Sequence, residues 1–388
     1  MPNAVIVDAV RTPVGRAFKG SLASLRPDET LAYTIDQLLE RNPDVDPKSV
    51  EEVISGCGLP QGLQANNISR IAVLLSEKLG QETNGITVSR YCASGLDAVR
   101  NAANAVQAGQ GDVYIAGGVE FVSRYTGAQE AANPDDQNTK LQGKEPGQPD
   151  AYIAMGLTAE NVAVKYNVSR EDQDKFAQQS QERAVAAQEN GIFDREIIPL
   201  TLADGTVVSK DDGPRASSTY EKLSQLQPAF REGGTVTAGN SCPLNDGAAA
   251  ALIMSEDKAA ELGLKPRARF ITAATWGNEP ELMGVAPIGA IKKALERAGM
   301  SISDVDIYEL NEAFAAQVIP IAEEVGFDYA KLNPHGGAIA LGHPFGQTGV
   351  RILTTLLNDL ETLDGEFGLE TMCVAQGQGE AAIIQRLN

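Results

Sequence analysis

Apolar residues along the chain form two kinds of segment, and these segments follow each other in the same order twice. In the first part, the apolar runs 5–10 and 53–56 predict strands, and a helical pattern lies between them. Farther along, the runs 270–274 and 307–310 flank a second helical pattern in the same way. Because the order of elements is the same in both places, the pattern predicts a duplicated core.

The second part of each unit also matches. Residues 86–88 predict a short buried strand, and residues 113–116 predict the next one. Apolar residues at helical intervals indicate the helix between them: Leu96, Val99, Ala103 and Val106. In the second half, a predicted helix at about 349–357 precedes the strand 371–374. Strands that alternate with helices predict a mostly parallel sheet with helices on both faces.

A segment of different character separates the two halves. It begins with a polar stretch rich in Gln, Pro, Asp and Gly, and continues with helical patterns at 156–166 and 170–190. Ser169 and Asp172 are spaced as an N-terminal cap of the second helix, and Gly191 closes it. We therefore predict three regions, a first core half at 1–120, an insertion that returns to the core at 121–265, and a second core half at 266–388.

Composition and charge restrict the partners of the chain. It has 388 residues, of which 43% are apolar and 22% charged, and a formal net charge of -20. Such a surface repels phosphate at long range, which argues against nucleic acid and acidic membranes as partners. The first ten residues lack a secretion signal, and no stretch approaches the roughly 20 apolar residues of a membrane span. We expect a cytoplasmic location and no membrane partner.

The cysteines point to chemistry rather than to cross-linking. Cys57, Cys92, Cys242 and Cys373 are far apart and form no C-x-x-C pair, so neither a disulfide framework nor a structural zinc site is predicted. With only two histidines in the chain, a metal site built on histidine is not expected either. Free thiols are therefore predicted, and the setting of each one becomes informative.

Two side chains have local settings that suit catalysis. Cys92 follows a strand at the start of a helix, where the helix dipole favours a thiolate, although a buried cysteine can also be a small apolar core residue. His343 lies between Gly342 and Pro344 in a glycine-rich run, where it can take a proton near neutral pH or simply bond to a turn backbone. From position alone, both interpretations of each residue stay open.

Several segments together resemble the thiolase family over essentially the whole chain. They are Arg90–Leu96, Gly117–Glu120, Asn311–Phe314, Gly336–Pro344 and Cys373–Gly379. The resemblance implies an α/β thiolase fold, in which two duplicated mixed-sheet halves form layers in the order α-β-α-β-α. It also implies that the insertion is a loop domain over the coenzyme A site.

The resemblance assigns a role to each reactive side chain. Cys92 would carry the acyl group, His343 would deprotonate it, and Cys373 would move a proton at the carbon next to the thioester. The N–H groups of Cys92 and Ala375 would form one oxyanion hole, and His343 with a water held by Asn311 would form the other. The family usually has glycine where this chain has Ala375 and Gln376. Glu312, beside Asn311, would organise the site.

The resemblance also implies contacts to coenzyme A. Met155 and Met283 would line the pantetheine channel, although methionine is more often plain core. Cys242 stands where many relatives have a serine, and Arg215 would pack against the adenine end. Ala313 and Phe314 complete the expected substrate-binding set. Biosynthetic members commonly have histidine before the first of these methionines, where this chain has Ala154.

These residues predict an acyl-CoA C-acyltransferase. It would condense acetyl-CoA, or cleave 3-ketoacyl-CoA with free CoA, as a homodimer or homotetramer that needs no metal or separate cofactor. We expect short acyl chains, because the segment after Glu120 is polar, and acetoacetyl-CoA is the best candidate. Two alternatives remain: a decarboxylating condensing enzyme, against which Cys373 argues, and a non-catalytic acyl-CoA or lipid-binding relative, which often lacks the motif at 311–314.

Overall fold

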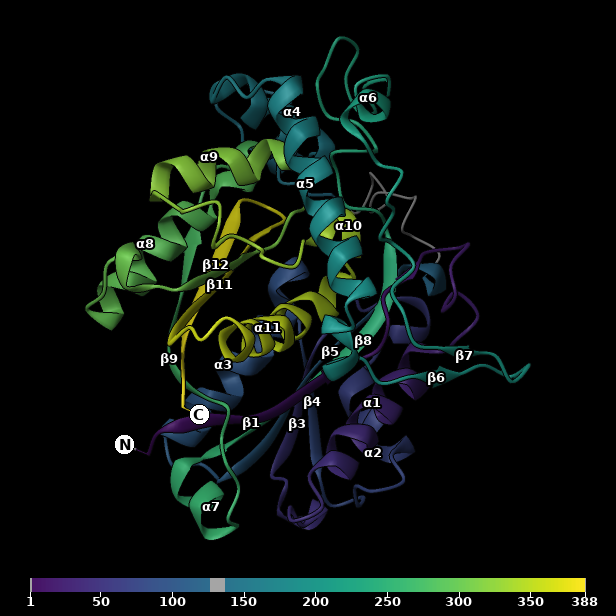
Figure 1. Ribbon diagram of the computed structural model, residues 1–388, viewed down its shortest axis with the longest axis vertical. Helices are drawn as coiled ribbons and strands as arrows, with labels where there is room; N and C mark the ends of the chain where they lie inside the picture. Colours follow the sequence, from purple (N-terminus) through teal and green to yellow (C-terminus); the bar gives the residue numbers. More distant parts are fainter. Residues whose placement is uncertain (1, 126–136, 388) are drawn as a thin grey trace.

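A mixed ten-stranded sheet runs through the computed structural model, which describes residues 2–125 and 137–387 (Figure 1). The strand order is β10-β11-β12-β9-β1-β8-β5-β3-β4, and the short β2 pairs with β8. The strands are β1 (Ala4–Arg11), β2 (Gly15–Arg16), β3 (Glu52–Gly56), β4 (Asn84–Val88), β5 (Val113–Phe121), β8 (Asn245–Ser255), β9 (Ala268–Gly277), β10 (Ile307–Leu310), β11 (Phe367–Val374) and β12 (Gln378–Arg386). The two halves meet where β1 pairs briefly with β9, Val5 opposite Arg269 and Ile6 opposite Ala268.

The expectation of a mostly parallel sheet was wrong. Only the pairs β3/β4, β3/β5 and β10/β11 are parallel, whereas β8 and β12 run antiparallel to their neighbours. For β12 the reason is local: β11 turns directly into β12 through the three residues 375–377, and no helix intervenes to carry the chain back. The mixed sheet implied by the family resemblance is confirmed.

The helices form three layers around the two halves of the sheet. The helices are α1 (Pro27–Arg41), α2 (Ile68–Leu75), α3 (Ser94–Gln107), α4 (Met155–Lys165), α5 (Arg170–Glu189), α6 (Tyr220–Leu223), α7 (Glu256–Glu261), α8 (Pro287–Ala298), α9 (Ala315–Val325), α10 (Ala338–Leu341) and α11 (Phe345–Thr362). One apolar cluster packs α1 and α2 on the first half of the sheet, and another packs α8 and α9 on the second. A third holds α3 and α11 between the halves, at the centre of Figure 1. This is the expected layer order.

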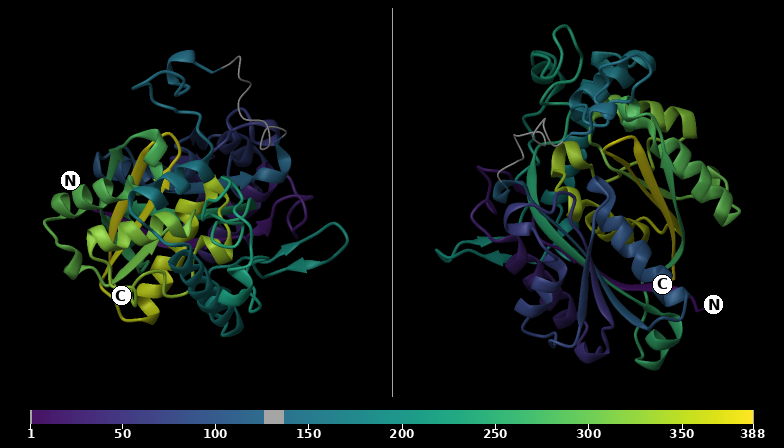
Figure 2. Two further views of the ribbon diagram at one scale, coloured as in Figure 1. Left: turned by 90° about the horizontal axis from the view of Figure 1, so that it is seen from above. Right: turned by 180° about the vertical axis from the view of Figure 1, so that it is seen from behind.

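The segment between the halves lies mainly over one end of the layers. Figures 1 and 2 show α4 and α5 beside α9 and α10, with α6 next to α5, and a small hairpin of β6 (Leu200–Thr201) and β7 (Val207–Val208) projects to one side. The predicted cap is present, since the Ser169 hydroxyl accepts from the N–H of Asp172, and Gly191 has a left-handed φ of 70°. Part of the polar stretch, residues 126–136, lies outside the described residues. The domain boundaries at 120 and 265 stay a prediction.

Two local expectations need correction. The strand at 86–88 is not buried: it belongs to β4, an edge strand of the sheet, and Ile86 is 44% exposed. Its apolar residues suggested burial, but an edge strand has a neighbour on one side only. The helix expected at 349–357 extends over Phe345–Thr362, because its first turn begins directly after Pro344 and nothing in the sequence breaks it before Leu363.

Candidate active site

Two central helices bring Cys92 and His343 to the same place. Cys92 lies in a short turn just before α3, and His343 lies just before α11. The helix backbones touch near these ends: a Cβ on Gly95 would lie 2.7 Å from the carbonyl oxygen of Gly346, and one on Gly349 would lie 2.1 Å from the N–H of Leu96. Gly95 lies three residues after Cys92, and Gly346 lies three residues after His343. The close approach of the two helices therefore sets the position of Cys92 relative to His343.

The hydrogen bonds of His343 define its tautomer. The Thr348 hydroxyl donates to the carbonyl oxygen of Pro344 over 2.8 Å, so it can only accept from the histidine ring 2.6 Å away. Nδ1 of His343 therefore carries the hydrogen. Nε2 then has the lone pair, and the side-chain amide of Asn311 lies 3.3 Å from it. The base is presented on Nε2, as a neutral imidazole needs.

Asn311 is held by a loop that leaves the parallel pair of β10 and β11. Its N–H donates to the carbonyl oxygen of Thr371, and the side chain is fully buried. The neighbouring Glu312 accepts hydrogen bonds from Ser180, Asn333 and the backbone N–H of Ile339. Glu312 thus ties α5 and the glycine-rich run at 336–342 to the loop, as its expected organising role requires. The Oδ1 atom of Asn311 has no hydrogen-bond partner among the described residues.

The end of β11 and the turn after it complete the site. Cys373 is fully buried, and the backbone N–H of Ala375 donates to the sulfur of Cys92. Ala375 does not have a positive φ; the left-handed backbone falls on Gln376 at 66° and Gly377 at 76°. Alanine therefore serves at 375 without strain, and the less usual residue in this turn is Gln376.

Burial dominates the titration of the reactive groups. It raises the pKa of the Cys92 thiol well above its ordinary value of 9.0, and the nearby Cys373 and Cys242 raise it further. Burial and the charge of Arg351 lower the pKa of His343 to about 3. Burial and the neighbouring thiols therefore oppose the thiolate that the start of a helix was expected to favour at Cys92. Near neutral pH the site contains a thiol and a neutral imidazole.

One apolar cluster collects most of the expected substrate-binding residues. Cys373, Met283, Ala313 and Phe314 are buried in it, and Met155 and Cys242 pack against it. The backbone N–H of Cys242 also donates to the carbonyl oxygen of Ala313 over 3.0 Å. These residues come from five separate segments of the chain, so their meeting is a property of the fold.

Arg215 lies apart from this cluster, in a cavity of about 300 Å³. The same cavity is lined by Arg16, Lys222, Ser241 and Pro243, so Cys242 lies between two lining residues. Three cations around one cavity suit an anionic ligand in a chain whose overall charge is negative. The 241–243 segment thus borders the Arg215 cavity through Ser241 and Pro243, and Cys242 packs against the apolar cluster that contains Cys373.

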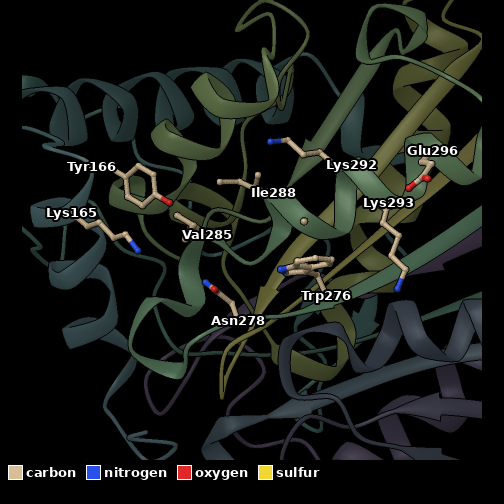
Figure 3. Close-up of a pocket in the computed structure, with 10 residues that line it drawn as sticks. Lys165, Tyr166, Trp276, Asn278, Val285, Ile288, Lys292, Lys293 and Glu296 are labelled. Atoms are coloured by element: carbon tan, nitrogen blue, oxygen red, sulfur yellow. The ribbon is translucent and has the colours of Figure 1, made fainter. Parts of the chain in front are cut away.

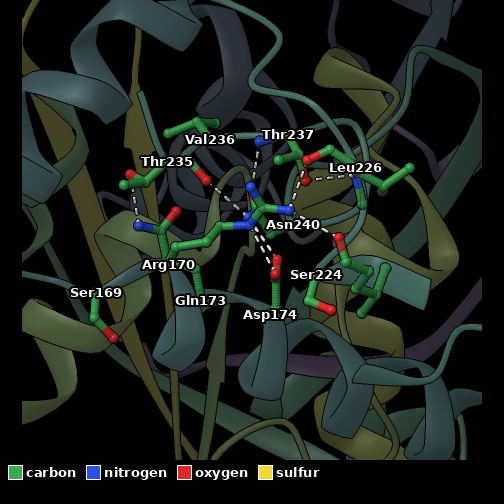
Figure 4. Close-up of polar contacts among 12 residues, drawn as sticks. Ser169, Arg170, Gln173, Asp174, Ser224, Leu226, Thr235, Val236, Thr237 and Asn240 are labelled. Carbon is green, nitrogen blue, oxygen red and sulfur yellow. Dashed lines mark hydrogen bonds and ion pairs between the residues drawn. The ribbon is translucent and has the colours of Figure 1, made fainter. Parts of the chain in front are cut away.

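A polar network anchors that segment to α5 (Figure 4). The side-chain amide of Asn240 donates to Asp174 over 2.9 Å, and Arg170 donates to the same carboxylate over 2.7 Å. Arg170 also donates to the carbonyl oxygens of Leu223 and Leu226, which line the Arg215 cavity. One turn of α5, from Arg170 to Asp174, therefore holds both Asn240 and the backbone of two residues that line the cavity.

A larger cavity, of about 560 Å³, lies elsewhere. Figure 3 shows Trp276, Tyr166, Lys165 and Lys293 around it, on the side of α8 and the end of α4. It contains none of the side chains expected to react or to bind coenzyme A. Size alone therefore does not identify the candidate site.

The sequence did not single out several side chains that contact the reactive residues. Gln317 donates to the sulfur of Cys373, Thr348 fixes the ring of His343, and Asn245 accepts from the His343 N–H. Only Thr348 carried a usable signal, because it follows His343 by little more than one helical turn. His335 lies away from these groups and pairs with Asp359.

Neither metal ligation nor membrane insertion is indicated by the described residues. They contain no group of three or more His, Cys, Asp or Glu side chains placed to hold a metal ion. Within the same part of the chain, no helix has the length and apolar character needed to cross a membrane. All four cysteines are free thiols.

Fold and site together define an α/β protein with a cysteine and a nearby histidine at the starts of its two central helices. The N-terminal domain of thiolase matches residues 4–257, and the C-terminal domain matches residues 264–386. The chain is 44% identical to a beta-ketoadipyl-CoA thiolase of Acinetobacter baylyi over the full length of both. The crystal structure of the Bacillus anthracis acetyl-CoA acetyltransferase superposes with a TM-score of 0.92 at 39% identity, covering 100% of this chain and 99% of that one.

A dimeric peroxisomal thiolase of Saccharomyces cerevisiae also has a TM-score of 0.92, at 38% identity over 100% of this chain and 98% of its own. The chain belongs to the thiolase family of acyltransferases. The expected fold and class of enzyme are thereby confirmed.

Proposed function

We propose that the protein makes or breaks the carbon–carbon bond next to a CoA thioester through an acyl group on Cys92. The proposal rests on one observation: three segments of the chain come together around the sulfur of Cys92. The N–H of Ala375 donates to it, the thiols of Cys373 and Cys242 adjoin it, and α11 presents His343 from the opposite helix. This arrangement supports a mechanism in which Cys92 is the nucleophile, His343 the base and the N–H of Ala375 an oxyanion donor.

The resting protonation states determine how the protons move. His343 is neutral, so Nε2 takes the proton of Cys92 as the sulfur attacks the thioester. Cys373, whose pKa burial raises to about 11, starts as a thiol and can give its proton to the departing CoA sulfur. Cys92 then bears the acyl group, Cys373 is a thiolate and His343 is an imidazolium.

The second half-reaction returns both protons. The Cys373 thiolate takes a proton from the α-carbon of a second acetyl-CoA, whose electron pair attacks the acyl carbon on Cys92. The Cys92 sulfur leaves and recovers its proton from His343. The oxygen of the second thioester becomes enolate-like in this step, and the His343 ring with a water bound to Asn311 stabilises it. The cycle balances without a metal or a separate cofactor.

Coenzyme A thioesters are proposed to lie across the two sites described above. Arg215 would contact the nucleotide end, and Met155, Met283, Cys242, Ala313 and Phe314 would surround the pantetheine arm. For the acyl group we infer a short chain, with acetoacetyl-CoA first. The Acinetobacter relative is named a beta-ketoadipyl-CoA thiolase, so 3-oxoadipyl-CoA is the main alternative substrate to acetoacetyl-CoA.

Two measurements test this function. Intact-mass analysis after incubation with acetyl-CoA should show one added acetyl group, mapped to Cys92; an unlabelled protein, or a label on Cys57, would contradict the proposal. Steady-state kcat/KM for 3-ketoacyl-CoAs from C4 to C16, with 3-oxoadipyl-CoA in the same panel, gives the substrate. A maximum at C10 or longer would overturn the short-chain inference. Formation of acetoacetyl-CoA from malonyl-CoA but not from acetyl-CoA alone would favour the decarboxylating alternative.

We also propose that the protein is a homo-oligomer, built on a dimer. β4 is an edge strand with unpaired backbone groups, and Ile86 on it and Leu74 and Leu75 on the adjacent α2 are 44%, 53% and 45% exposed. An edge strand flanked by apolar side chains is a suitable surface for a second copy. The yeast relative is described as dimeric. A tetramer and a cytoplasmic location stay predictions.

A further inference from the structure

The side chain of Gln317 ends against the sulfur of Cys373. Gln317 lies in the first turn of α9, and both residues are fully buried. Its Nε2 atom is 2.8 Å from the Cys373 sulfur and donates to it. The motif that places Asn311 beside His343 therefore continues into a helix that places an amide beside Cys373.

The amide has a preferred orientation. Its Oε1 atom has no hydrogen-bond partner among the described residues. The reversed orientation would turn Oε1 to the sulfur, where a carbonyl oxygen cannot donate and would repel a thiolate. Gln317 therefore points an N–H at the sulfur. A hydrogen bond of this direction is strongest when the sulfur is a thiolate.

The surrounding chain prevents the amide from moving away. A Cβ on Gly284 would lie 2.9 Å from Cβ and 3.0 Å from Oε1 of Gln317, so the turn beside Met283 packs directly on this side chain. Burial raises the pKa of Cys373, and the hydrogen bond from Gln317 lowers it. The interaction thus opposes the main obstacle to forming a thiolate at this position.

We propose that Gln317 is a positioning residue for Cys373, which fixes the direction of its sulfur and stabilises its thiolate during proton transfer. This inference rests on the proposed function, in which the Cys373 thiolate forms as CoA departs and is used in the second half-reaction. CoA can leave as a thiolate without an obligatory acid, so the rate of Cys92 acylation does not depend on the hydrogen bond from Gln317. The effect of Gln317 falls on the second half-reaction, where Cys373 takes the proton of the α-carbon.

The test separates the two half-reactions in a Gln317→Leu variant. Leucine keeps the approximate volume and removes the N–H donor. Rapid-quench mass analysis should give a rate of Cys92 acetylation within about twofold of the wild type. Turnover should fall by about tenfold to a hundredfold, the range for a lost hydrogen bond to a charged group, with KM little changed. Exchange of the α-protons of acetyl-CoA in D₂O should slow by the same factor.

Gln173→Leu is a matched control. Gln173 is also fully buried, its Nε2 donates to Thr235 over 2.9 Å, and its Oε1 has no partner among the described residues. It lies in α5 and touches no reactive group, so this variant should keep normal α-proton exchange.

The outcomes that contradict the proposed function differ from those that contradict the role of Gln317. Wild-type protein without an acetyl label on Cys92 would contradict the proposed function itself. A normally labelled Gln317→Leu variant with wild-type turnover and exchange would overturn the role of Gln317. A variant that loses labelling together with turnover would also overturn it, because the defect would then not be confined to Cys373.

Discussion

A carboxylate oxygen of Glu120 accepts a 2.9 Å hydrogen bond from the backbone N–H of Gly346, three residues after His343. The same oxygen accepts from the N–H of Gly58, and Gln64 donates to the other oxygen. Glu120 is fully buried, and it joins the start of α11 to two segments of the first half. The position of His343 relative to Cys92 therefore depends on a carboxyl group that touches neither.

The titration of Glu120 predicts a pH-dependent stability. Burial raises its pKa from 4.5 to about 7. Between these values the folded state binds more protons than the unfolded chain, so the contribution of Glu120 to the free energy of unfolding falls as pH rises through this window. The total change is about 3 kcal/mol. In urea titrations, the stability of the wild type relative to Glu120→Gln should decline from pH 4.5 to pH 7 and then level off. A constant difference would contradict the assignment.

The tautomer of His343 should depend on Thr348. Thr348→Val removes the acceptor of the Nδ1 hydrogen, so the ring can carry its proton on Nε2 and lose its base. We expect acetylation of Cys92 to slow by about tenfold to a hundredfold, within the range of a general base. Thr348→Ser keeps the hydroxyl and should react at close to the wild-type rate. Equal rates for valine and serine would show that the hydroxyl does not select the tautomer.

Cys373 and His343 should affect different steps. Cys373→Ala should still be acetylated at Cys92, because a CoA thiolate, with a thiol pKa near about 8.5, leaves without an obligatory acid. It should lose condensation and thiolysis by about 10²–10⁴-fold. His343→Ala should slow the acetylation itself. Rapid-quench mass analysis beside steady-state assays gives both values, and near-normal turnover of Cys373→Ala would refute the proposed mechanism.

The contact between α3 and α11 should be sensitive to a single methyl group. Gly95→Ala places a Cβ 2.7 Å from the carbonyl oxygen of Gly346, so one helix must shift. We expect a loss of about 1–3 kcal/mol in the free energy of unfolding and slower acetylation of Cys92. Gly277→Ala is the control, because nothing lies within 4 Å of its Cβ position, and it should change stability by less than about 0.5 kcal/mol. Equal effects of the two variants would argue against the close approach.

The edge strand gives a test of assembly. Ile86→Lys puts a charge on the exposed apolar surface of β4 and should shift the protein toward monomer in sedimentation velocity at micromolar concentration. Val207→Lys changes a residue that is 59% exposed on the small β6–β7 hairpin, and should leave assembly unchanged. An Ile86→Lys protein with the wild-type sedimentation coefficient would place the interface elsewhere.

Much of the candidate site could be predicted from the sequence, because each of its parts is indicated by residues that are neighbours in the chain. Cys92 and His343 each precede a central helix, and the repeated order of strands and helices brings equivalent ends of the two halves together. The motif at 311–314 follows β10, at an edge where parallel strands end. These features need only neighbours in the chain and the rule that repeated units pack alike.

What the sequence could not provide depends on residues far apart in the chain. The exposure of Ile86, the antiparallel return of β8, and the amide of Gln317 at Cys373 all follow from packing between segments. The same holds for protonation: the start of a helix favours a thiolate at Cys92, but burial among distant segments raises the pKa of this thiol. Desolvation is the sum of every neighbour in space, so it is decided only when the chain has folded.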